Sequence, residues 1–136
     1  MSDIGPVAYP GGAVYVYTFI NLISGRHVTW SFGQYMHIII DIFRSWLLVK
    51  TYKLAYMNQK VKNLHIYALM LMQAKYKFAS VVFNFNDTIV HLVSLISIYY
   101  QLSERQYLAI FFMGFASSIK MSAFLYIPGA MLVSSF

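Results

Sequence analysis

The chain has 136 residues, of which 60% are hydrophobic and only 10% charged; ten basic and four acidic side chains give a formal net charge of +6. A soluble domain carries about 25% charged residues, so this composition excludes an ordinary cytosolic enzyme and a disordered chain and indicates an integral membrane protein. In such a protein the basic excess marks cytoplasmic loops, not a nucleic-acid surface, and the lack of cysteine excludes disulfides and thiolate chemistry.

The first predicted elements are a loop over residues 1–12 and a helix over residues 13–24. Prolines and glycines are frequent between Gly5 and Gly12, which predicts irregular backbone there. The helix would rise only about 18 Å, which is too short for the ~30 Å hydrocarbon core of a bilayer. We therefore expect an interfacial helix near the N-terminus.

Residues 28–49 form the first segment long enough to cross a membrane, about 33 Å as a helix. Polar residues recur on one face of this helix: Gln34, His37, Asp41 and Arg44. Asp41 and Arg44 can pair at i, i+3. These residues either form an internal pair that fixes packing and topology or contact a substrate. By itself, the stripe would favour a small transporter or channel component.

The rest of the chain is predicted to be a cytosolic basic loop over residues 50–63 and membrane helices over residues 64–77, 78–100 and 107–127, the last interrupted by Lys120. Alternation of the spans then gathers four features on the lumenal side: residues 1–12, Lys75 with Lys77, Asn86 with Asp87, and Lys120. A buried ammonium group is costly unless an anion pairs with it. No acidic residue lies within a helical turn of Lys120, so we expect its partner to be an anionic, lipid-linked substrate.

Four segments, in chain order, form a set: Asp3 to Gly12, Gly33 to Met36, Phe85 to Asp87, and Ser118 to Met121. They resemble the stretches Asp-x-Gly-Pro-x-x-Tyr-Pro-Ala-Gly, Ala-Gln-x-Ile, Leu-Phe-Asn-Asp and Ser-Val-Lys-Met of the dolichyl-phosphate-mannose-dependent alpha-1,3-mannosyltransferases of asparagine-linked glycosylation. The order and spacing of all four agree, and together they cover nearly the whole chain.

This resemblance implies an all-α polytopic membrane helix bundle, part of a GT-C-type glycosyltransferase fold in the endoplasmic reticulum membrane, without a cofactor. The implied reaction transfers mannose from dolichyl-phosphate-mannose to a 3-hydroxyl of the five-mannose, diphosphodolichol-linked oligosaccharide. Lys120, helped by Lys75 or Lys77, would bind the phosphate. The residues implied in contacts to the sugar are Tyr9, Pro10, Asn86 and Asp87. The candidates for the carboxylate base are Asp3 and Asp87.

Several of these residues also have structural interpretations. Lys120 could extend along the helix to the interface, Asn86 and Asp87 could cap a helix start, and Tyr9 with Pro10 could form a turn. Asp87 and His91 are spaced like two metal ligands, but no third ligand is near, so no metal site is expected. Asn86, Asp87 and Thr88 fit the N-glycosylation pattern, and we expect Asn86 to be unmodified because it lies at the mouth of an apolar span.

The chain also departs from the family pattern. Family members carry a first transmembrane helix and an acidic, Trp-containing lumenal loop upstream of Gly-Pro, where their catalytic acid is expected, and the later arginine of the pattern is Phe83 here. We therefore expect a truncated or reduced relative. The alternative is a non-catalytic polytopic membrane protein, or a decayed paralogue, on the same scaffold.

Overall fold

The computed structural model describes residues 10–25, 30–56 and 86–134, and every regular element within these ranges is helical. The elements are α1 (Gly11–Ile23), α2 (Trp30–Ala55), α5 (Asp87–Leu102), α6 (Gln106–Ile119), the 3₁₀-helix η1 (Met121–Tyr126) and α7 (Ile127–Ser134). The predicted all-α class is confirmed for these residues. Within the same ranges, no helix combines the length and apolar content needed to cross a membrane, so the polytopic arrangement stays a prediction.

Part of the predicted organisation cannot be compared with the structure. The helix predicted over residues 64–77 lies outside the described residues, as do the start of the helix predicted over residues 78–100, most of the loop over residues 50–63 and the first nine residues of the chain.

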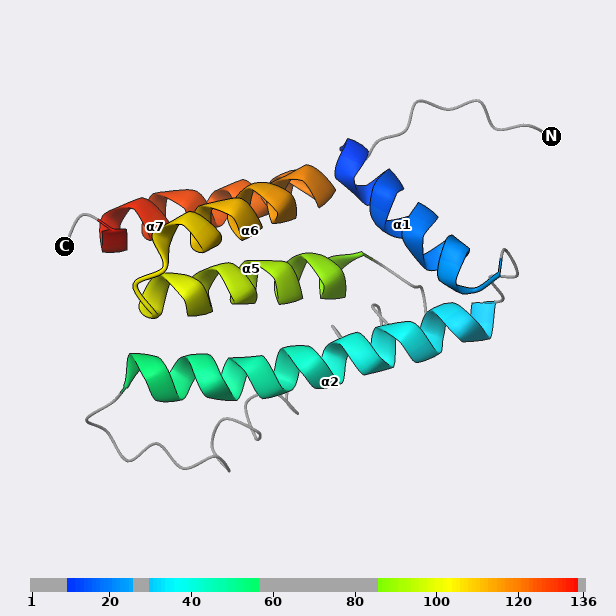
Figure 1. Cartoon of the computed structure of the whole chain (residues 1–136), viewed down its shortest axis with the longest axis horizontal. Coiled ribbons are helices and arrows are strands. Elements are labelled where there is room, and N and C mark those ends of the chain that lie inside the picture. Colours follow the sequence, from blue (N-terminus) through cyan, green and yellow to red (C-terminus); the bar gives the residue numbers. More distant parts are fainter. Residues whose placement is uncertain (1–9, 26–29, 57–85, 135–136) are drawn as a thin grey trace.

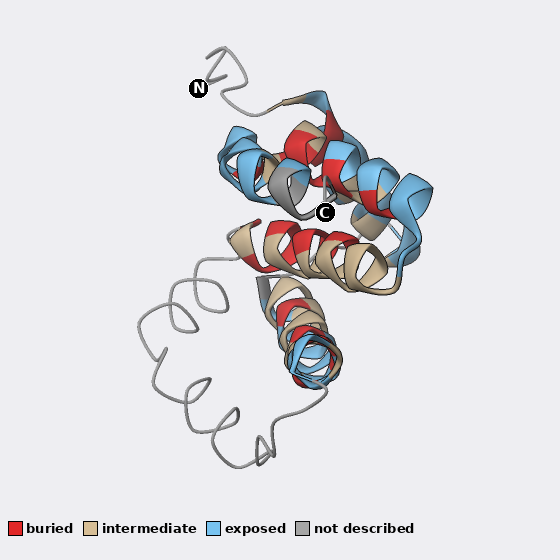
Figure 2. Ribbon diagram, turned by 90° about the vertical axis from the view of Figure 1, so that its left-hand side faces the viewer, coloured by how far each residue is buried: buried red, intermediate tan, exposed pale blue. Residues whose placement is uncertain are grey.

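Helix α5 occupies the centre of the bundle, between α2 on one side and α6 on the other (Figures 1 and 2). Helices α5 and α6 form an antiparallel hairpin, whereas α2 and α5 run in the same direction (Figure 1). Helix α1 packs against α6, and η1 and α7 return along α6 toward the turn of the hairpin. As a result, the start of α1, the start of α5 and the end of α6 meet at one end of the bundle.

The core combines alanines, which allow the helix backbones to approach closely, with isoleucines and valines. Its buried residues are Ala13, Ile89, Val90, Val93, Ala116, Ile119 and Ala123. A buried hydroxyl links the two helices of the hairpin, because Ser97 donates a hydrogen bond to the Ala109 carbonyl at 2.7 Å. Small residues combined with interhelical hydrogen bonds are typical of helix packing in membranes.

The turn between α5 and α6 is a Schellman motif. The Arg105 amide donates to the Tyr100 carbonyl at 2.9 Å, and the Glu104 amide donates to the Gln101 carbonyl at 3.1 Å. Glu104 has φ +60°, the left-handed conformation that this position requires and that glycine usually supplies. The motif satisfies the last carbonyls of α5 and reverses the chain, so that α6 packs directly back onto α5.

Helix α1 begins two residues earlier than the sequence predicts, inside the segment expected to be a loop over residues 1–12. Pro10 precedes the helix with φ −57°, and its carbonyl accepts a hydrogen bond from the Ala13 amide at 3.0 Å. Gly12 is buried, and a Cβ atom there would lie 2.5 Å from the Ser118 carbonyl oxygen. Gly12 therefore allows α1 to approach α6 closely and is not part of an irregular loop.

Helix α2 continues to Ala55, beyond the predicted end at residue 49 and into the predicted basic loop. Contacts between residues four apart hold the additional turns. The Lys50 ammonium lies 5.4 Å from the centre of the Trp46 ring, Thr51 donates to the Leu47 carbonyl at 2.9 Å, and the rings of Tyr52 and Tyr56 stack. The lysines of this segment, Lys50 and Lys53, are thus compatible with a helix.

The structure also differs from the continuous helix predicted over residues 107–127. Helix α6 ends at Ile119, and Lys120 has extended backbone with φ −150° and ψ 129° before η1 begins. Ile119 and Ala123 are fully buried on either side of this break, which anchors it in the core. Pro128 is the second residue of α7, where its missing amide hydrogen has no intrahelical partner to lose.

The close approach of α1 to α6 predicts different consequences for two adjacent glycines. Gly12→Ala should lower the free energy of unfolding by about 1–3 kcal/mol, because its methyl group meets backbone atoms that cannot rotate away. Gly11→Ala is the matched control and should change stability little, since no atom lies within 4 Å of a Cβ there. Thermal unfolding of both variants in detergent checks this, and equal losses would contradict it.

Candidate functional site

Three segments that are far apart in the sequence meet at one end of the bundle. They are the start of α1 at Gly11 and Gly12, the start of α5 at Asp87, and the end of α6 at Ser118 and Lys120. Gly12 lies against Ser118, and Asp87 forms an ion pair with Lys120. Three of the four sequence motifs therefore contribute to one location, which we call the motif cluster: residues 10–12, 86–88 and 118–120.

Lys120 owes its position to the break between α6 and η1. Its amide still donates to the Ala116 carbonyl at 3.1 Å, whereas its extended backbone turns the side chain away from the α6 helical path. Because Ile119 is fully buried next to it, the lysine cannot shift far along the bundle. The side chain remains about one-third exposed (32%) and can be reached from outside.

Asp87 is the counter-ion of Lys120. The two residues are 33 positions apart, and the ammonium group of Lys120 donates to the Oδ1 atom of Asp87. The helix dipoles favour both charges, since Asp87 lies in the first turn of α5 and Lys120 lies at the C-terminal end of α6. Both side chains are about one-third exposed, so water weakens the attraction between them.

This ion pair corrects the expectation that only an external anion could neutralise Lys120. The separation of the two residues along the sequence did not indicate this contact, because the antiparallel packing of α5 and α6 brings the start of one helix beside the end of the other. In the observed geometry, the carboxylate of Asp87 orients a basic neighbour.

Asn86 and Thr88, which flank Asp87, are both buried. Asn86 occupies the position before α5, and its carbonyl accepts hydrogen bonds from the amides of Ile89 and Val90 at 3.1 Å. Its side chain makes no capping hydrogen bond. Within the described residues, the Asn86 Oδ1 and Thr88 Oγ1 atoms have no hydrogen-bond partner. The expected side-chain cap is therefore not formed. The buried side-chain amide of Asn86 could reach a polar ligand only if the segments of the motif cluster moved apart.

The polar stripe of α2 faces the interior of the bundle. His37 and Arg44 are buried, and the Arg44 Nη2 atom lies 2.7 Å from the Asp41 Oδ1 atom, which confirms the pairing predicted at i, i+3. Helix α2 packs against α5, so the stripe lies on a helix adjacent to the one that carries Asp87 and His91.

The remaining predicted site residues divide into two groups. Pro10 lies at the motif cluster, where it starts α1 and is half-buried. Asp3, Tyr9, Lys75 and Lys77 lie outside the described residues. The described part of the site therefore consists of one cation, one carboxylate and two buried polar groups, a combination that can bind an anion at Lys120 and a hydroxyl group at Asp87.

Comparison with known proteins gives one match. Residues 1–136 match the family model described as ALG3 protein, so the match includes all four motifs. No curated protein and no solved structure matches the chain.

The burial of Asn86 predicts that its glycosylation pattern is not used. A bulky oligosaccharide on an amide that is 3% exposed at a helix start would not fit the packed bundle, so the chain folded in microsomes should not change its electrophoretic mobility after digestion with peptide N-glycosidase. A secreted glycoprotein digested in parallel is the control. A mobility shift that Asn86→Gln abolishes would contradict the burial of this residue.

The ion pair predicts an energetic coupling between Asp87 and Lys120. In a double-mutant cycle with Asp87→Asn and Lys120→Met, the coupling free energy should be about 0.2–1 kcal/mol, as for other partly exposed pairs. Denaturant unfolding of the four proteins measures it. Repeating the cycle with Lys53→Met in place of Lys120→Met is the control and should give no coupling, because Lys53 lies near the end of α2 at the opposite end of the bundle.

Proposed function

The chain belongs to the ALG3 protein family, and from this membership we propose that it binds dolichyl-phosphate-mannose at the motif cluster and transfers mannose to a lipid-linked oligosaccharide. The family is one of mannosyltransferases that act in the assembly of the N-glycan precursor. The single observation that carries the proposal is the convergence of three family-like motifs around Lys120, whose ammonium group is held in place and still partly exposed.

In the proposed reaction, Lys120 binds an oxygen of the dolichyl phosphate as a point charge. The phosphodiester of the donor carries one negative charge, as the Asp87 carboxylate does, and in the proposed complex it takes the place of that carboxylate on Lys120. The bond between C1 of mannose and the phosphate oxygen breaks while C1 bonds to the 3-hydroxyl oxygen of the acceptor. The electron pair leaves with the phosphate, and Lys120 stabilises the negative charge that develops there.

The acceptor hydroxyl must lose its proton during this step, and Asp87 is the described residue placed to take it. Once phosphate has replaced the Asp87 carboxylate on Lys120, that carboxylate can accept a hydrogen bond from the hydroxyl group. Asp3 is the other candidate base. We propose the alpha-1,3 linkage and the five-mannose acceptor because the motifs resemble those of the family.

The orientation of side chains on α2 supports contact with membrane lipid, and a multi-pass location in the endoplasmic reticulum membrane belongs to the proposal through the family. The large outward side chains of this helix are apolar or aromatic and exposed: Tyr35, Ile38, Ile39, Ile42, Phe43 and Trp46. The charged pair Asp41 and Arg44 faces inward instead. This polarity is the reverse of that of a helix in water and suits a helix whose outer face contacts lipid.

A second candidate function is that of a non-catalytic membrane protein on the same scaffold. The observation that favours it is the ion pair itself, since it engages the carboxylate that catalysis would need. The two candidates differ in what they require of Asp87: in the enzyme the carboxylate takes part in the transfer, and in the scaffold it only holds Lys120.

Binding and transfer measurements on the full chain in membranes test the proposal. Lys120→Met should weaken binding of dolichyl phosphate about 10- to 100-fold, because it removes a charged hydrogen bond. Lys120→Arg should retain part of the binding. Lys53→Met, an exposed lysine near the end of α2, is the matched control and should bind like the parent.

Transfer of labelled mannose to the five-mannose lipid acceptor distinguishes the two candidates. Asp87→Asn should bind dolichyl phosphate at least as well as the parent and lose about 10²–10⁴-fold in transfer rate if Asp87 is the base. Unchanged transfer would exclude Asp87 from the chemistry. Unchanged binding by Lys120→Met would place the phosphate site elsewhere.

A further inference from the structure

A groove of about 360 Å³ lies between the second half of α2, helix α5 and η1, and it is separate from the motif cluster. Its volume is within the range of small-molecule sites. The residues that line it are Leu48, Thr51, Tyr52, Ala55, Tyr56, His91, Ser94, Leu95, Ile98, Leu102 and Tyr126. Along α5 the lining runs from His91 to Leu102, about 16 Å at the rise of an α-helix, so the groove is elongated.

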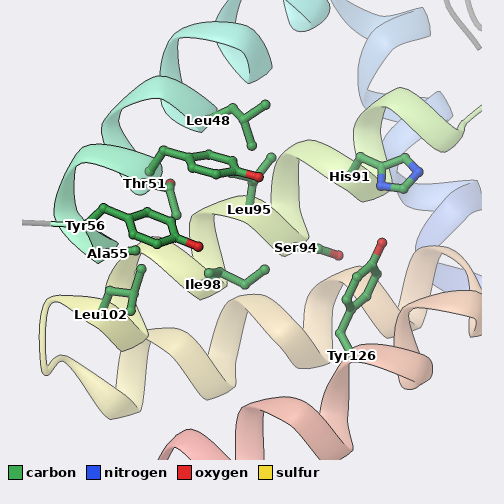
Figure 3. A pocket seen from close by; sticks show the side chains of 11 residues that line it. Leu48, Thr51, Ala55, Tyr56, His91, Ser94, Leu95, Ile98, Leu102 and Tyr126 are labelled. Atoms are coloured by element: carbon green, nitrogen blue, oxygen red, sulfur yellow. The ribbon is translucent and has the colours of Figure 1, made fainter. Parts of the chain in front are cut away.

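On the α5 side of this groove, the polar groups gather at one end. The hydroxyl groups of Ser94 and Tyr126 point into the same region, and the His91 ring lies beside it (Figure 3). The other end is formed by the side chains of Leu102, Ala55 and Tyr56, beyond Ile98 (Figure 3). The α2 side adds the hydroxyl groups of Thr51, Tyr52 and Tyr56, of which Thr51 is bonded to the Leu47 carbonyl. A wall of α5 that runs from polar to apolar side chains fits an amphiphile that lies along it.

Ser94 gives the strongest indication of a ligand. The residue is 3% exposed, lines the groove, and its Oγ atom has no hydrogen-bond partner among the described residues. A serine within a helix usually bonds back to the preceding turn, as Ser117 does to the Met113 carbonyl at 2.9 Å. A buried hydroxyl without a partner is unfavourable, and a ligand oxygen in the groove would remove this cost.

The lining also selects the charge of the ligand. No aspartate, glutamate, lysine or arginine is among the residues that line the groove. The nearby lysine, Lys120, is bonded to Asp87 and does not line it. A phosphate or an amine placed here would lose water without gaining an oppositely charged Asp, Glu, Lys or Arg side chain, whereas a neutral hydroxyl group could both donate to and accept from Ser94 and Tyr126.

From these observations we propose that the groove binds a linear long-chain alcohol. Its hydroxyl group hydrogen-bonds to Ser94, next to Tyr126 and His91, and its hydrocarbon chain lies along Leu95, Ile98 and Leu102. The site goes beyond the proposed function, since its ligand carries neither phosphate nor sugar and does not contact Lys120. A linear chain suits the elongated shape better than a compact ring system does.

Photolabelling of the full chain in nanodiscs of ether-linked phosphatidylcholine tests this site, because such lipids lack ester carbonyls that would compete. The probe is hexadecanol with a diazirine and an alkyne on its chain, and labelled peptides are identified by mass spectrometry. Labelling should fall on the α2 and α5 segments of the groove. Ser94→Ala should raise the concentration for half-maximal labelling about 2- to 10-fold, the effect of one lost hydrogen bond.

The matched control is Ser97→Ala, one turn further along α5, because Ser97 donates to the Ala109 carbonyl and does not line this groove. It should label like the parent. Ser94→Ala should fold at least as stably as the parent, since it removes an unpaired buried hydroxyl. Ala55→Trp, at an exposed position of the lining, should block the apolar end and reduce labelling independently of Ser94.

Three results would overturn the proposal. The first is labelling by the Ser94→Ala and Ala55→Trp variants at the parent concentration. The second is tighter binding of hexadecyl phosphate than of hexadecanol in competition, which would show that the head group is charged. The third is equal competition by a sterol, which would show that the groove does not select a linear chain. None of these outcomes depends on mannosyl transfer or on Lys120, so failure of this site and failure of the proposed function remain distinguishable.

Discussion

The contact between the start of α5 and the end of α6 is the constraint on which the described site depends. Two antiparallel helices, connected by the turn at Glu104, bring Asp87 and Lys120 together although they are 33 residues apart. Helix α6 stops at Ile119, and the ammonium group of Lys120, on the extended backbone that follows, reaches Asp87. The fully buried residues Ile119 and Ala123 lie on either side of this break.

Close packing at this end of the bundle is made possible by residues with small or absent side chains. Gly12 lets α1 approach the backbone of Ser118, and Ala13, Ala116 and Ala123 fill the adjoining core. In the resembling motif Tyr-Pro-Ala-Gly, the position that matches Gly11 is alanine and the position that matches Gly12 is glycine. The structure supplies a physical reason for this difference, since a methyl group has room at Gly11 and meets backbone atoms at Gly12.

The distribution of polarity connects the fold with its proposed surroundings. Charged and hydroxyl groups lie between the helices, as in the pair of Asp41 and Arg44 and in the hydrogen bond from Ser97 to the Ala109 carbonyl, while large apolar side chains cover the outer face of α2. Two sites of opposite character result. The motif cluster holds a partly exposed cation that suits a phosphate, and the groove at Ser94 holds neutral hydroxyl groups that suit an uncharged head group.

The sequence by itself determined the all-α class, the pairing of Asp41 with Arg44 and the mannosyltransferase family, because each depends on composition, on spacing within one helix or on local motifs. Only the tertiary structure decided the partner of Lys120, the burial of Asn86 and the groove at Ser94. These features depend on which helix faces which, and no local pattern specifies the neighbour of a side chain across two packed helices. The helix boundaries at Ala55 and Ile119 differ from the predicted ones for a related reason: side-chain contacts and core packing, and not hydrophobic run length, determine where these helices end.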